Sequence, residues 1–73
     1  MNALKIQIRT KKSDSAFVYH TLEAHEGLTA YSTIDHKRGE QTRDMELIFP
    51  PESEKDVREL LKDLQAMMWL EIL

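Results

Sequence analysis

The chain has 73 residues, a net charge of −3 and no cysteine, which excludes a disulfide framework and a thiolate zinc site and argues against general nucleic-acid binding. No apolar stretch approaches the roughly 20 residues that a membrane-spanning helix needs, and the first residues lack the apolar core of a signal peptide. We therefore expect a single cytoplasmic domain over residues 1–73, too small to bury a large core.

The first predicted element is a half-buried strand over residues 4–9. Its sequence, LKIQIR, alternates apolar and polar residues, so that Leu4, Ile6 and Ile8 share the inner face. The polar stretch TKKSDS follows it. Its composition is typical of a turn that leads into a helix.

An amphipathic helix is predicted from about Asp14 to Glu26. Ser13 or Asp14 can cap its first turn, and Gly27 can end it because glycine enters the left-handed region without a Cβ penalty. The residues expected on its inner face recur at helical spacing. They are Phe17, Val18, Thr21, Leu22 and His25.

A hairpin of two strands is predicted next, over residues 28–35 and 43–49, joined by the polar loop HKRGEQT. We expect the first of these strands to turn one set of alternate residues inward: Leu28, Ala30, Ser32 and Ile34. The other set, which includes Tyr31, then faces outward. In the second strand the inward residues are Met45, Leu47 and Phe49.

The clearest helix spans residues 52–68, with Ser53 at its cap and Glu54 and Arg58 at pair spacing. Its inner face is expected to hold Val57, Leu60, Leu61, Leu64, Met67 and Met68. The final WLEIL either extends this helix or forms a short fourth strand. We favour the strand, because three strands cover two helices poorly.

The order β-α-β-β-α-β predicts an α+β fold in which both helices cover one face of an antiparallel sheet. Right-handed crossovers place the third strand between the first and the second. The expected layout is the ferredoxin-like open sandwich of three or four strands.

Two resemblances follow from these residues. The helix ending in EAHEGLTAYSTID resembles the ACT-like branch of ferredoxin-like folds, which implies a regulatory module that binds small ligands, often at subunit interfaces. The stretch from Tyr19 to Leu64 is similar to a family of short bacterial proteins of unknown function, through an aromatic-rich first helix, the LEAHEGL turn and the STID strand. That family implies no activity, and the loop TKKSDS lacks the glycine of ACT ligand sites.

Catalytic and metal sites are not predicted. His20 and Glu23 are three residues apart on one helix, a spacing that can start a metal site, but no second pair accompanies them. No serine or threonine stands in a nucleophile turn. We expect a protein that is not an enzyme and needs no cofactor.

An anion site is predicted where two basic segments meet. The first two strands run parallel in this layout, so the loops after them, together with the positive end of the first helix, share one end of the sheet. The candidate residues are Arg9, Lys11, Lys12, Ser13, Lys37 and Arg38, with Arg43 nearby. The alternative is a solvated rim that acidic neighbours partly neutralise.

An apolar interface is the competing prediction. Tyr31 and Ile48 are expected on the open face of the sheet, and Trp69 at the uncovered C-terminal end. Such surface on a small chain often marks an interface, and a homodimer is the usual outcome. The chain is thus expected to sense a small anionic metabolite, or alternatively to bind a protein partner without any ligand.

Overall fold

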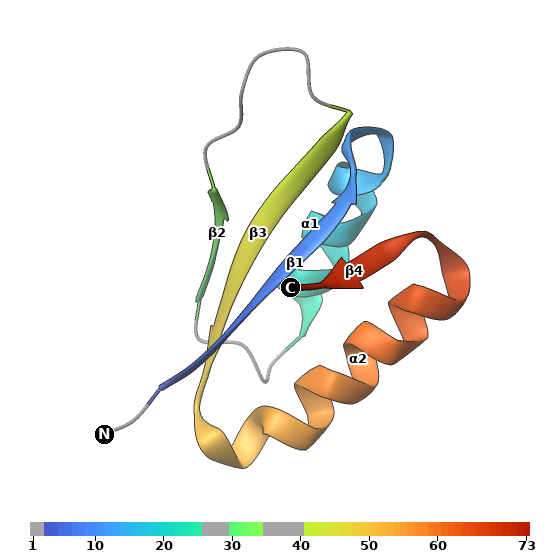
Figure 1. Cartoon of the computed structure of the whole chain (residues 1–73). Coiled ribbons are helices and arrows are strands. Elements are labelled where there is room, and N and C mark those ends of the chain that lie inside the picture. Colours follow the sequence, from blue (N-terminus) through green and yellow to red (C-terminus); the bar gives the residue numbers. More distant parts are fainter. Residues whose placement is uncertain (1–2, 26–29, 35–40) are drawn as a thin grey trace.

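Alternating apolar residues build a four-stranded sheet in the computed structural model, which describes residues 3–25, 30–34 and 41–73. The strands are β1 (Leu4–Lys11), β2 (Ala30–Ile34), β3 (Thr42–Phe49) and β4 (Leu70–Ile72). Their order is β2-β3-β1-β4, and every neighbouring pair is antiparallel (Figure 1). The predicted position of the third strand and the predicted fourth strand are both confirmed.

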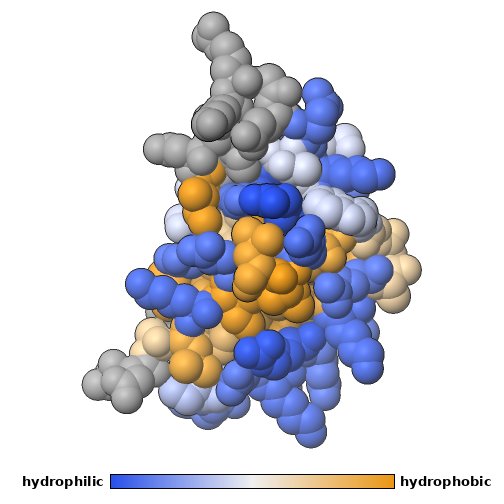
Figure 2. All heavy atoms as spheres, in the orientation of Figure 1, coloured by the Kyte–Doolittle hydropathy of each residue, from blue (hydrophilic) through white to orange (hydrophobic). Residues whose placement is uncertain are grey.

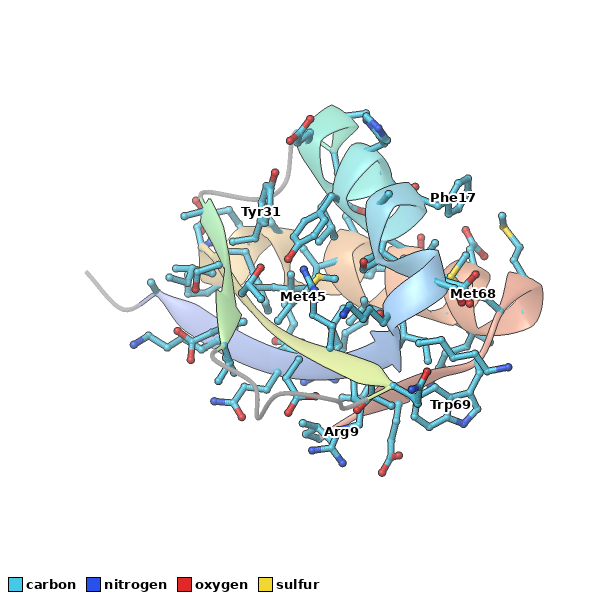
Figure 3. All side chains as sticks on the ribbon, turned by 90° about the horizontal axis from the view of Figure 1, so that it is seen from above. Arg9, Phe17, Tyr31, Met45, Met68 and Trp69 are labelled. Carbon is cyan, nitrogen blue, oxygen red and sulfur yellow. The ribbon has the colours of Figure 1, made fainter. Side chains whose placement is uncertain are left out.

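Two helices, α1 (Ser15–Ala24) and α2 (Glu54–Met67), cover the same face of this sheet (Figure 3). Each follows a short 3-10 turn, at Lys12–Asp14 and Pro51–Ser53. One apolar core joins the helices to the sheet. Its residues are Ile6, Ile8, Val18, Leu22, Met45, Leu47, Phe49, Val57, Leu61, Leu64 and Leu70. The predicted α+β, ferredoxin-like open sandwich is confirmed.

The predicted inward face of β2 is wrong. Tyr31 pairs with Leu47 and Thr33 with Met45, and paired residues share a face, so Tyr31 and Thr33 point toward the helices. The Tyr31 ring packs against the apolar core. The alternation of this strand allowed either face, and the tyrosine ring buries more apolar area than the alanine and serine of the other set.

Several predicted helix details also differ. Phe17 and Met67 are exposed, at 47% and 63%. The buried side of α1 consists of Ser15, Val18 and Leu22, and the buried side of α2 consists of Val57, Leu61 and Leu64. Neither Asp14 nor Ser53 makes a side-chain cap bond, although Ser53 does precede α2. The Ser15 hydroxyl instead donates to the Lys12 carbonyl at 2.8 Å. The predicted stop at Gly27 lies outside the described residues.

No helix among residues 3–25, 30–34 and 41–73 is long and apolar enough to cross a membrane.

Candidate functional site

A hollow of about 460 Å³ opens at the end of the sheet where β1 finishes and β3 begins. The last pair of these strands is Lys11 with Thr42. Beyond it, the backbone N–H of Lys12 donates to the Gln41 carbonyl at 2.8 Å, which fixes the 3-10 turn against the start of β3. The turn between α2 and β4 closes the third side with Trp69.

The lining of this hollow combines one charge, several polar groups and a large ring. It consists of Lys11, Ser13, Gln41, Thr42 and Trp69. Trp69 is 44% exposed, so its indole presents free surface to anything that enters. An ammonium group, two hydroxyls and an amide beside an indole can hold an anion whose body is planar and apolar.

The predicted basic residues do not all reach this hollow. Lys11 and Ser13 line it, and Lys12 is exposed beside them. Arg9 lies on the open face of the sheet, where its Nε and Nη2 donate to the two carboxylate oxygens of Asp44 at 2.8 and 3.1 Å. Arg9 is not among the residues that line the hollow. Lys37 and Arg38 lie outside the described residues.

Arg43 lies on the opposite face of the sheet from Arg9. It pairs with Thr10, which is fully buried, so it lies on the helix-facing side of the sheet. Its Nε is buried and has no hydrogen-bond partner among the residues that the structure describes. Arg43 is not part of the lining of the hollow.

The predicted interface residues are also separated. Ile48 lies on the open face opposite Lys5, as expected, but Tyr31 does not. The Tyr31 hydroxyl donates to Glu23 of α1 at 2.6 Å, and its ring centroid lies 5.7 Å from that of Tyr19. The Tyr19 hydroxyl in turn bonds Thr33. Figure 3 shows Tyr31 directed toward the helix layer, so its predicted exposure on the open face is wrong.

The bond to Glu23 has an electrostatic consequence. It stabilises the protonated phenol, and partial burial and the nearby Glu23 charge act in the same direction. Together they raise the pKa of Tyr31 above its ordinary value. These contacts fasten the edge strand β2 to α1.

His20 and His25 lie apart from the hollow, and His36 lies outside the described residues. His20 is exposed on α1. His25 lines a smaller hollow of about 260 Å³ with residues of α2, namely Asp56, Glu59, Leu60 and Asp63. Within the described ranges, no group of three or more histidine or carboxylate side chains is arranged to hold a metal ion.

Sequence reasoning missed Gln41 and Thr42. They stand at the end of the polar hairpin loop, and only the register of β3 against β1 brings them beside Lys11. Trp69 was expected at an interface, not beside the basic residues. The fourth strand places it there, since Leu70 pairs with Thr10.

The open face of the sheet carries hydrophilic side chains around an apolar region near its middle, and further apolar side chains lie toward the left of the view (Figure 2). That region lies where Figure 1 marks the C-terminus. The last two residues of the chain, Ile72 and Leu73, are 39% and 50% exposed. The open face therefore shows an apolar region with hydrophilic side chains around it.

Comparison with known proteins gives a family and no activity. A family model described as "Domain of unknown function (DUF4911)" matches residues 8–68 of this chain. No curated protein and no solved structure matches it. The match confirms the resemblance to a family of unknown function.

Proposed function

We propose that this chain, which belongs to the DUF4911 family of unknown function, is a non-enzymatic module that binds a small anion carrying a planar apolar group. The site is the hollow between Lys11, Ser13 and Trp69. The family description names no ligand, so the proposal depends on the chemistry of these side chains. Binding of such a metabolite would make the domain a sensor.

One observation carries this proposal: the ammonium group of Lys11 and the indole of Trp69 line the same hollow, although 58 positions of sequence, 69 minus 11, separate them. A charged group and an aromatic surface side by side suit a ligand that has both an anionic and a flat part. The hydroxyls of Ser13 and Thr42 add donors for the same anion.

The chain supplies its own reporter, because Trp69 is its single tryptophan. We expect phenyl phosphate to change the Trp69 fluorescence with saturation. Inorganic phosphate supplies only the anionic group and phenol only the planar ring, so each should bind more weakly than phenyl phosphate. The proposal is wrong if phenyl phosphate gives no saturable change.

A pair of matched variants separates the site from general charge. Lys11→Gln removes the ammonium and should weaken phenyl phosphate about tenfold, the typical effect of losing a charge-assisted contact. Lys62→Gln removes a lysine that is also exposed but lies on α2, outside the hollow, and should leave binding unchanged. Equal weakening by both variants would mean nonspecific attraction.

A second candidate function is protein interaction through exposed apolar surface, including a homodimer. Among the residues that the structure describes, five large apolar side chains are between 39% and 63% exposed, which is typical of interaction surfaces on small domains. They are Phe17, Met67, Trp69, Ile72 and Leu73. Sedimentation of the pure chain over a range of concentrations distinguishes this candidate, because a dimer should form without phenyl phosphate.

A further inference from the structure

A length of sheet edge is left open where β4 ends. β1 has eight residues and pairs with β3 along its whole length, but it pairs with β4 only from Ile8 to Thr10. One more bond, from the N–H of Leu73 to the Gln7 carbonyl at 2.8 Å, extends this ladder. Before Gln7, none of the described residues pairs with β1 on this side.

The open edge presents main-chain groups to solvent. Along an antiparallel ladder, the N–H and C=O groups of successive residues point to opposite edges of the strand. The Gln7 carbonyl points toward β4, so the N–H and C=O of Lys5 point the same way, beyond the end of β4. Unpaired groups of this kind are a template for another strand.

A hollow of about 480 Å³ lies beside this edge and is separate from the one at Lys11. It reaches from the open face of the sheet to α2. Its lining consists of Lys5, Ile6, Gln7, Glu46, Arg58, Ile72 and Leu73. An added strand would therefore have both a main-chain partner and space for its side chains.

β4 itself indicates which sequence this edge accepts. The first and last residues of β4, Leu70 and Ile72, lie on the helix-facing side, opposite Thr10 and Ile8. The middle residue, Glu71, lies on the open face opposite Arg9. The free part of β1 repeats this pattern. In this free part, Leu4 and Ile6 face the helices and Lys5 lies on the open face. An apolar–acidic–apolar segment would therefore pair with residues 4–6 in the same way as the LEI sequence of β4 pairs with residues 8–10.

We propose that the edge of β1 at Lys5 binds an extended segment of a partner protein in which apolar and acidic residues alternate. The segment adds to the sheet antiparallel to β1 and continues the line of β4. Main-chain bonds to Lys5 supply affinity, and the pairing of an acidic residue with the Lys5 ammonium supplies selectivity.

The test uses the full chain and two blocked peptides, acetyl-Val-Glu-Val-Glu-Val-amide and its counterpart with lysine in place of glutamate. Amide NMR should show the largest shifts at Lys5, Gln7 and Leu73 with the acidic peptide, and slower hydrogen exchange at the Lys5 N–H. The basic peptide should bind at least about threefold more weakly, as expected for like charges on opposite strands.

Two variants of one residue separate the main-chain and charge contributions. Lys5→Pro removes the N–H that faces the open edge and leaves the β3 ladder intact, so it should fold and lose peptide binding. Lys5→Glu keeps the N–H and should reverse the preference, so that the basic peptide binds more tightly. This second variant tests the site even where the proline variant does not fold.

Three results would overturn the proposal. The first is equal binding of both peptides by the unmodified chain, and the second is binding that persists in folded Lys5→Pro. The third is a concentration-dependent dimer that Lys5→Pro dissociates, because it would assign this edge to a second copy of the chain. None of these results depends on phenyl phosphate or on the hollow at Lys11.

Discussion

The two helices are held to the sheet in different ways. α2 buries Val57, Leu61 and Leu64 at regular helical spacing, with at most 2% of any of them exposed. α1 buries two apolar residues and a serine, and the strand that follows it is held by tyrosine contacts. Apolar periodicity therefore accounts for most of the packing of α2, with one polar contact from the Gln65 amide to the Leu70 carbonyl, whereas the α1–β2 side depends more on specific aromatic and polar contacts.

The largest expected effect tests the α2 side. Leu61→Ala deletes a fully buried side chain and should lower the free energy of unfolding by about 2–5 kcal/mol, measured by urea denaturation. Met67→Ala, on the same helix at 63% exposure, should change it by no more than about 0.5 kcal/mol. Similar losses from both variants would contradict the assigned inner face.

The same contrast explains what the sequence predicted. β1, β3 and α2 each carry one apolar face, so the fold class and most of the core followed from spacing. β2 has residues on both faces that could pack against the helices. Which face does so depends on the pairing of Tyr31 with Leu47, a long-range contact that the spacing of apolar residues does not encode.

The candidate site was predictable only in part. Lys11 is the last residue of β1 and Ser13 lies in the turn that follows it, so chain order placed both at the correct end of the sheet. Gln41 and Trp69 join them through strand register, which a single sequence does not reveal. The ion pair of Arg9 with Asp44 depends on the same register, and it removes one expected cation from the site.

An intermediate effect is expected on the α1–β2 side. Tyr31→Ala removes the ring contact with Tyr19 and the bond to Glu23, and should lower the melting temperature by on the order of 5 °C. Ser32→Ala, at the next position on the open face, should change it by about 1 °C or less. If the two variants behave alike, Tyr31 does not fasten this strand.

The smallest expected effect concerns pH and the same contact. The hydrogen bond to Glu23 first, then burial and nearby charge, raise the pKa of Tyr31 above its ordinary value of about 10. The folded chain then holds this proton more tightly than the unfolded chain. The resulting stabilisation is fully present below about pH 10 and is lost as the pH rises through the raised pKa.

Tyrosinate absorbance measures this titration, and Tyr19→Phe leaves Tyr31 as the only tyrosine. Adding Glu23→Gln removes the negatively charged carboxylate that accepts the hydrogen bond of the phenol, so the midpoint should fall toward 10. Glu59→Gln, a matched change of an exposed glutamate on α2, should leave the midpoint in place. If the midpoint is unaltered in both variants, the Tyr31–Glu23 bond is not formed in solution. The attachment of β2 to α1 would then depend on ring packing alone. The α1–β2 side would be held mainly by apolar packing, as α2 is.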